Sequence, residues 1–197
     1  MNETNCEVYD IIISFVRSYR NTDSEHPYIK SQYNGQDTWI WNCHYLLNQI
    51  LRHVNIPPER YLVSEKAYEK WSQISTDNIN NYYDGSVVKC EFDNVEIKEF
   101  KGNGKNYSNR IINKGDTFIF NRVFLLEHMI PISKIIDALV SLPDNQLDYH
   151  HVDEILSKRY VCRILKEEDA LITRKYNRSL DVDEVLESDY HDIKVIR

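Results

Sequence analysis

An acid, a histidine and a proline follow a run of strand-forming residues in the second half of the chain. The run covers residues 118–126, and Glu127, His128 and Pro131 come directly after it. Aromatic, branched and aliphatic residues favour a strand, and proline ends a strand because it has no backbone N–H to donate. We therefore expect the carboxylate and the imidazole to be held rigidly at a strand end.

Residues 127–131, Glu-His-Met-Ile-Pro, resemble the acid-His pair and following proline that open the ββα-metal core of the HNH nucleases. A second stretch, residues 160–169, is similar to the second strand of that family running into its helix, where the closing metal ligand falls at Asp169. The chain departs from the family pattern at Tyr160, which stands where the family has its middle asparagine. It also departs in residues 132–158, a long connection with helical character between the two strands.

The resemblance covers about residues 116–178 and implies a divalent-metal-dependent endonuclease that hydrolyses DNA, of a restriction or other defence type. Histidine is partly unprotonated near neutral pH, so His128 would act as general base and activate a water molecule. Glu127 and Asp169 would be the metal ligands, because carboxylate oxygens are preferred by Mg²⁺ and Mn²⁺. The implied cofactor is Mg²⁺ or Mn²⁺, and the implied partner is DNA.

Basic residues near these positions are candidates for substrate binding. Arg122, Arg163 and Lys166 could contact phosphate groups, although isolated basic residues are commonly solvated. The segment 101–105, Lys-Gly-Asn-Gly-Lys, is a further phosphate-contact candidate, and its composition is equally typical of a tight surface turn.

The same residues also have structural interpretations. A histidine after a hydrophobic run is often a hydrogen-bonded structural residue. Residues 166–169 are typical of a charged first helical turn, in which acids interact favourably with the helix dipole. On that interpretation Glu167 and Glu168 are solvated, and Asp169 belongs to the same turn.

Two other functions remain open. One is a non-catalytic acidic binding protein, or an inhibitor of a nucleic-acid enzyme, that uses the acidic tail at 181–192 or the aromatic N-terminal helices. This hypothesis predicts that Glu127 and His128 can be replaced without loss of activity. The other is a ribonuclease of the HEPN type, whose Arg-polar-x-His signature loosely resembles residues 20–26, although Pro27 follows and a loop is expected there.

Composition bounds the function further. The chain has 197 residues, 42% of them hydrophobic, which is sufficient for a packed core. The net charge of −7 argues against a protein that coats nucleic acid nonspecifically, because the long-range attraction to phosphate would have the wrong sign. A homodimer formed through the N-terminal helices remains open.

The four cysteines are scattered, with no CxxC pair, which disfavours a zinc knuckle or a disulfide framework. The apolar residues 11–16 are too few for a membrane span and lack a basic leader. We therefore expect a cytoplasmic protein with no membrane association.

The pattern along the chain predicts an α+β fold. We expect a helical N-terminal region, residues 1–86, followed by a mixed region, residues 87–197, that contains the HNH-like core with a long helical insertion between its two strands. Helices are predicted near 5–19, 38–54, from 64 onward, 132–142, 152–158 with Asp148 as cap, and 181–192. Alternation at 87–92 and 95–100, around Asp93 and Asn94, predicts a β-hairpin.

Overall fold

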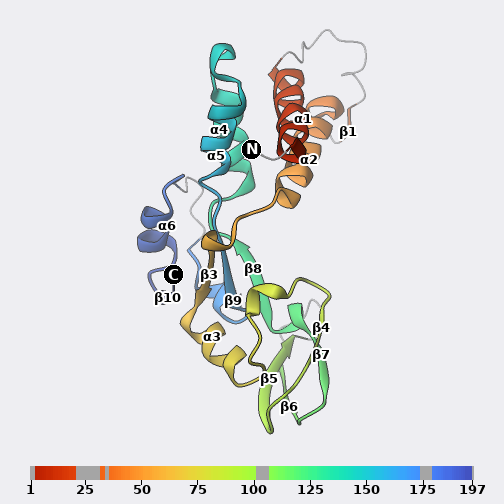
Figure 1. Ribbon diagram of the computed structural model, residues 1–197, viewed down its shortest axis with the longest axis vertical. Helices are drawn as coiled ribbons and strands as arrows, with labels where there is room; N and C mark the ends of the chain where they lie inside the picture. Colours follow the sequence, from red (N-terminus) through yellow and green to blue (C-terminus); the bar gives the residue numbers. More distant parts are fainter. Residues whose placement is uncertain (1–2, 21–31, 34–35, 101–106, 174–178, 197) are drawn as a thin grey trace. The chain divides into compact units, whose positions relative to one another are not determined.

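The protein is α+β, and its chain forms two compact units, which are described separately. The computed structural model describes residues 3–20, 32–33, 36–100, 107–173 and 179–196 (Figure 1). Unit 1 comprises Met1–Ile56 and Ile130–Arg159, and unit 2 comprises Pro57–Met129 and Tyr160–Arg197. Each unit takes segments from both halves of the chain, so the observed division differs from a single boundary at residue 86.

Unit 1 is mainly helical. The segment between the two expected core strands supplies two of its helices, which is the helical insertion predicted from the sequence. Its α-helices are α1 (Glu3–Arg20), α2 (Thr38–His53), α4 (Ile132–Ser141) and α5 (Tyr149–Leu156), with β1 (Gln32–Tyr33), β2 (Gln36–Asp37) and the 3-10 helix η4 (Asp144–Gln146). Apolar residues at helical spacing, including Ile12, Val16, Leu47 and Leu139, are fully buried.

Arg20 and Asp148 show how the helix ends of unit 1 are satisfied. The Arg20 guanidinium donates hydrogen bonds to the carbonyl oxygens of Val140 (2.8 Å) and Leu139 (2.9 Å), at the C-terminal end of α4. The Asp148 carboxylate accepts a hydrogen bond of 3.0 Å from the backbone N–H of His151, so the predicted cap of α5 is confirmed. Arg20 thus has a structural role, and the rest of the HEPN-like segment lies outside the described residues.

Unit 2 is built on a four-stranded sheet with the order β10-β3-β9-β8. β8 and β9 are antiparallel, β3 is parallel to β9, and β10 is antiparallel to β3. The central strand β9 is buried along its whole length, as expected for a strand covered on both faces. The strands are β3 (Tyr61–Ser64), β8 (Phe124–His128), β9 (Val161–Leu165) and β10 (Val195–Ile196).

Two α-helices of unit 2 begin at side-chain caps. The Ser64 hydroxyl accepts a hydrogen bond of 3.1 Å from the Ala67 N–H at the start of α3 (Glu65–Ser72). The Asp181 carboxylate accepts from the N–H of Asp183 at the start of α6 (Val182–Asp189). Both helices were predicted, because caps and apolar spacing are local features of the sequence. The 3-10 helices of this unit are η1 (Pro58–Arg60), η2 (Ile79–Asn81), η3 (Phe120–Arg122) and η5 (Glu168–Leu171).

The hairpin predicted at 87–92 and 95–100 is wrong. β4 (Val87–Lys89) pairs with β7 (Thr117–Ile119), and β5 (Val95–Phe100) pairs with β6 (Tyr107–Ile112), both antiparallel. Asn94 has a φ of 56° and lies with Asp93 in a bend, but the two flanking strands take other partners. The pairing of β4 with β7 places Val88 opposite Phe118, and both side chains are buried. The alternation of apolar and polar residues marks a strand but does not show which distant strand it pairs with.

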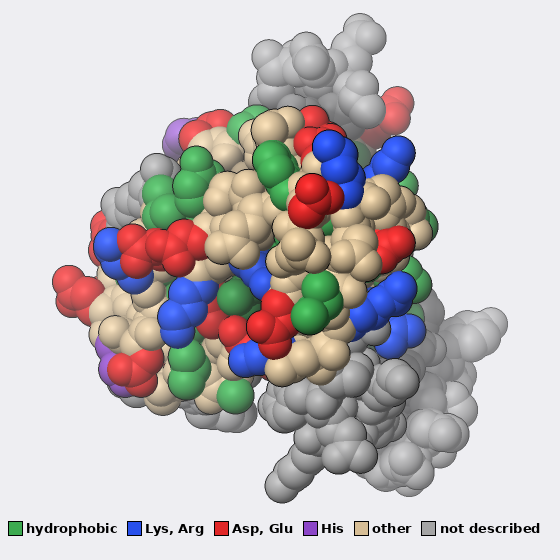
Figure 2. Space-filling model, turned by 90° about the horizontal axis from the view of Figure 1, so that it is seen from below, with side chains coloured by type: hydrophobic (Ala, Val, Ile, Leu, Met, Phe, Trp, Pro, Cys, Tyr) green, Lys and Arg blue, Asp and Glu red, His purple; other side chains and the backbone are tan. Residues whose placement is uncertain are grey.

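The two faces of the sheet in unit 2 have separate cores, because successive side chains of a strand point to opposite faces. One core centres on aromatic rings, in which Trp71 lies edge-on to Phe120 and Phe124. The other packs Leu62, Cys162 and Ile164 against the C-terminal segment, which contributes buried residues such as Val185 and Tyr190. On the face shown in Figure 2, acidic and basic side chains are interspersed over the described residues.

Candidate functional site

Glu127 and His128 are the last two residues of β8, as predicted. Glu127 is paired with Cys162 and His128 with Val161 in the antiparallel ladder with β9. The pairing extends one residue further, because the Met129 N–H donates a 3.0 Å hydrogen bond to the Tyr160 carbonyl oxygen. Pro131 then occupies the N-cap position of α4, without a side-chain hydrogen bond. The acid and the imidazole are therefore fixed at the point where a hydrogen-bonded strand ends.

The two side chains leave the strand on opposite faces of the sheet. Glu127 shares a face with its partner Cys162, and both Glu127 and His128 are half-buried. Burial raises the pKa of the Cys162 thiol, and the neighbouring carboxylates of Glu168 and Glu127 raise it further. The structure thus places two carboxylates, from Glu127 and Glu168, near one buried thiol. β8 is the terminal strand of this sheet.

The strand register separates Asp169 from this pair along the sheet. His128 is opposite Val161, whereas β9 ends four residues later at Leu165, opposite Phe124, a span of roughly 13 Å at about 3.3 Å per residue. Asp169 lies beyond that far end, in the four-residue 3-10 helix η5, where the resemblance implied a longer helix. The role of Asp169 as a second metal ligand stays a prediction, and it requires the carboxylate to reach back toward Glu127.

Glu168, expected to be solvated, is instead a buried residue with 2% of its surface exposed. Its carboxylate accepts a hydrogen bond of 2.5 Å from the Ser64 hydroxyl and one of 2.8 Å from the Leu165 N–H. The expectation was wrong because Ser64 lies 104 residues away in the sequence, on a strand that meets β9 only in the folded protein. Glu167, its neighbour, is exposed, and nothing local distinguishes the two glutamates.

The three basic candidates occupy different environments. Arg163 is 2% exposed, lies with its guanidinium carbon 5.0 Å from the centre of the Phe120 ring, and donates to the Tyr82 carbonyl oxygen. Burial lowers the pKa of its guanidinium, which is the sign expected for a desolvated cation. Arg163 is therefore part of the core and neither solvated nor placed to contact a phosphate, which corrects the expectation. Arg122 is exposed in η3, and Lys166 is half-buried just after β9.

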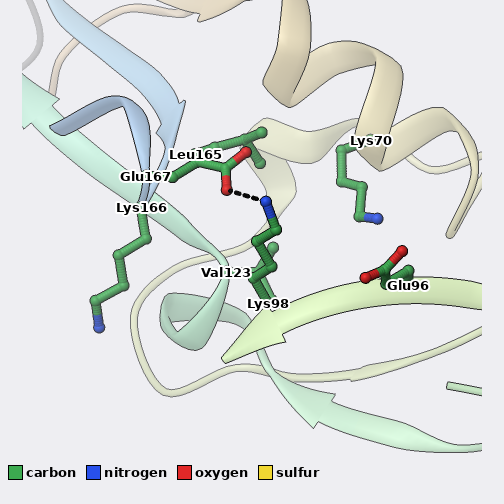
Figure 3. A pocket seen from close by; sticks show the side chains of 7 residues that line it. All are labelled: Lys70, Glu96, Lys98, Val123, Leu165, Lys166 and Glu167. Carbon is green, nitrogen blue, oxygen red and sulfur yellow. Dashed lines mark ion pairs between the residues drawn. The ribbon is translucent and has the colours of Figure 1, made fainter. Parts of the chain in front are cut away.

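A pocket of about 250 Å³ lies beside Lys166 in unit 2. It brings together side chains from α3, from β5 and from the segment after β9, and Figure 3 shows Lys98 paired with Glu167 inside it. The Lys98 ammonium is 3.3 Å from the Glu167 carboxylate. The residues that line the pocket are Lys70, Glu96, Lys98, Val123, Leu165, Lys166 and Glu167.

No local pattern in the sequence connects the residues that line this pocket. Lys70 was part of a helix and Lys98 part of a strand, and only tertiary packing places both beside the end of β9. The basic segment 101–105, expected to contact phosphate, lies outside the described residues. The same holds for the side chains of Cys6 and Cys43, whereas Cys90 and Cys162 are buried free thiols.

Comparison with protein-family models, with curated proteins and with solved structures found no match for this chain. Within the described residues, three or more His, Cys, Asp or Glu side chains are nowhere grouped so that they could hold a metal ion. A magnesium ion needs fewer protein ligands, because one or two carboxylates together with water and phosphate complete its coordination. Among the residues that the structure describes, no helix is both long enough and apolar enough to cross a membrane.

Proposed function

We propose that this protein is a divalent-metal-dependent endonuclease that hydrolyses DNA phosphodiester bonds, with His128 as the general base. The proposal is carried by the β8–β9 ladder, which ends in Glu127 and His128 on the terminal strand of a sheet. This arrangement supports the resemblance to the HNH core, in which an acid-His pair at a strand end is followed by proline. A role in restriction or another defence against foreign DNA is part of the same proposal.

Glu127 is the proposed metal ligand on β8. A half-buried carboxylate at a strand end can bind Mg²⁺ or Mn²⁺ while leaving several positions for water and for the substrate phosphate. The cation would neutralise charge that develops on the phosphate, and His128 would accept the proton of the attacking water. Asp169 is proposed as the second carboxylate, and its separate substitution tests whether it reaches the ion.

Electrostatics restricts how DNA would bind. The chain carries a net charge of −7, so attraction to the phosphate backbone must come from local cations and not from the protein as a whole. Arg122 is exposed and Lys166 half-buried, and both are retained as proposed phosphate contacts. We expect cleavage to fall steeply with salt, since each phosphate contact that is made releases counterions.

The decisive experiment compares cleavage by the wild-type chain with that by Glu127→Gln and His128→Ala. Supercoiled plasmids from methylating and non-methylating hosts would be incubated with Mg²⁺, with Mn²⁺ or with a chelator. Removal of a general base is expected to lower the cleavage rate by about 100-fold or more. The matched control is His150→Ala, because His150 is exposed on α5 in the other unit. Cleavage that survives in His128→Ala rejects the proposed base.

Asp169→Asn, assayed in parallel, separates two forms of the proposal. A loss equal to that of Glu127→Gln, together with weaker Mn²⁺ binding, supports the two-carboxylate site that the resemblance implies. Wild-type cleavage in Asp169→Asn would restrict the metal to Glu127. Absence of cleavage by the wild-type chain, together with equal inhibition of a nucleic-acid enzyme by the wild-type chain and all three variants, would favour the acidic binding or inhibitor protein instead.

A further inference from the structure

The pocket beside the end of β9 collects cations in a chain that is acidic overall. Lys70 reaches it from α3, Lys98 from β5, and Lys166 from the segment after β9. Figure 3 shows the ammonium groups of Lys70 and Lys98 on the side of the pocket where Glu96 and Glu167 lie, while Lys166 extends away from them. The lining carries three lysines and two glutamates, and with Lys166 directed away the charged groups that face one another are two ammonium and two carboxylate groups.

Lys70 and Lys98 differ in how their charges are compensated. Lys98 forms an ion pair with Glu167, but side-chain exposures of 52% and 40% make this pair weak and easily exchanged. Lys70 is half-buried, and burial is the main cause that lowers its pKa, with Glu96 and Glu167 opposing it. An anion bound between the two ammonium groups would compensate the charge of Lys70 that burial desolvates. It would also replace Glu167 as the ion-pair partner of Lys98.

The remaining lining residues determine what else the ligand carries. Val123 and Leu165 form an apolar wall, and both belong to buried parts of the aromatic core. Glu96 is exposed and its carboxylate accepts hydrogen bonds without donating any, so it suits an amino or hydroxyl group. A ligand that fits all three features has an anionic group, a flat or apolar body and hydrogen-bond donors.

We propose that this pocket binds one nucleotide, with its phosphate between Lys70 and Lys98 and its sugar or base against Val123 and Leu165. The size restricts the ligand to a single unit, because about 250 Å³ lies just below the roughly 300–1,000 Å³ of small-molecule pockets and is too small for a dinucleotide. Cytosine, adenine and guanine carry exocyclic amino groups from which Glu96 can accept a hydrogen bond, which favours them over thymine. The nucleotide is either free or the 5′-phosphorylated end of a strand.

Calorimetric titration of the full chain tests this assignment. The ligands are dCMP, dTMP, the nucleoside deoxycytidine, and a short oligonucleotide with and without a 5′-phosphate. We expect dCMP to bind more tightly than deoxycytidine, with a Kd that rises with salt. If the natural source is a strand end, the phosphorylated oligonucleotide binds at least as tightly as dCMP, and if it is a free nucleotide, only the mononucleotides bind.

Three variants and one control assign the binding to the pocket. Lys70→Met and Lys98→Met keep the apolar stem and are each expected to weaken dCMP binding about tenfold. Glu96→Gln is expected to reduce the preference for dCMP over dTMP, because a carboxylate that only accepts hydrogen bonds is replaced by an amide that can also donate to thymine. Lys114→Met is the control, since Lys114 is exposed and does not line the pocket.

Equal binding of dCMP and deoxycytidine would overturn the proposal, as would an equal loss in Lys70→Met and Lys114→Met. Absence of binding by any of the ligands at millimolar concentration would overturn it as well. The result is independent of the nuclease proposal, because His128→Ala leaves the pocket lining intact and must retain dCMP binding. Binding of dCMP without any cleavage of DNA would contradict only the nuclease proposal.

Discussion

The buried carboxylate of Glu168 joins two elements of unit 2 that are far apart in the sequence. It accepts hydrogen bonds from the Ser64 hydroxyl and the Leu165 N–H, and Ser64 at the same time caps α3. Glu168→Ala leaves both donors buried without an acceptor, and each bond to a charged group contributes about 1.5–3 kcal/mol. We therefore expect the free energy of unfolding of unit 2 to fall by about 3–6 kcal/mol.

Two further substitutions divide this loss between the bonds. Both bonds end on the same carboxylate oxygen, and Glu168→Gln keeps an amide oxygen that can accept both of them, so a smaller loss than for Glu168→Ala is expected. Ser64→Ala removes the hydroxyl and also the cap of α3, which contributes about 1 kcal/mol by itself. A double-mutant cycle between Ser64→Ala and Glu168→Ala is expected to give a coupling energy of about 0.5–3 kcal/mol, since the two residues are in direct contact.

Urea unfolding followed by tryptophan fluorescence and circular dichroism measures these changes. Trp71 lies on α3 in the aromatic core, and hydrogen exchange of the Leu165 amide reports the bond to Glu168 directly. Glu167→Ala is the matched control, because its ion pair with Lys98 is exposed and contributes at most about 1 kcal/mol. Equal destabilisation by Glu168→Ala and Glu167→Ala would refute the reasoning.

Three other predictions follow from single contacts. Arg163→Met is expected to leave stability within about 1 kcal/mol of wild type or to raise it, because the buried guanidinium has two nitrogens without a hydrogen-bond partner among the described residues; a large loss in thermal unfolding would contradict this. Asp181→Ala should destabilise α6 by about 1 kcal/mol, seen as faster amide exchange in that helix alone. Hydrogen bonds from His151 lower the pKa of the Asp148 carboxyl group in the folded protein below its usual 3.8. The ionised carboxylate therefore stabilises the folded protein above pH 3.8, and this stabilisation is lost as the pH falls through the lower pKa of the folded state. Asp148→Ala should remove this acid-side dependence from unfolding curves measured between neutral pH and pH 2.

The sequence by itself determined the features that depend on neighbouring residues. Helical spacing predicted α1, α2, α4 and α5, and an acid placed before an apolar run predicted the cap at Asp148. The end of β8 at His128 was predicted for the same reason, because strand formers and a proline act within a few residues. The pairing of β8 with β9 was also predicted, from the resemblance of two short stretches to one known core.

Tertiary structure alone decided which distant segments meet. Alternation marked strands at 87–89 and 95–100 but could not show that their partners are β7 and β6. Glu167 and Glu168 are identical neighbours in the sequence, yet only Glu168 faces Ser64, because β3 lies parallel to β9 in the fold. Burial and charge compensation depend on what packs against a side chain, and that is a property of the assembled sheet and not of the local chain.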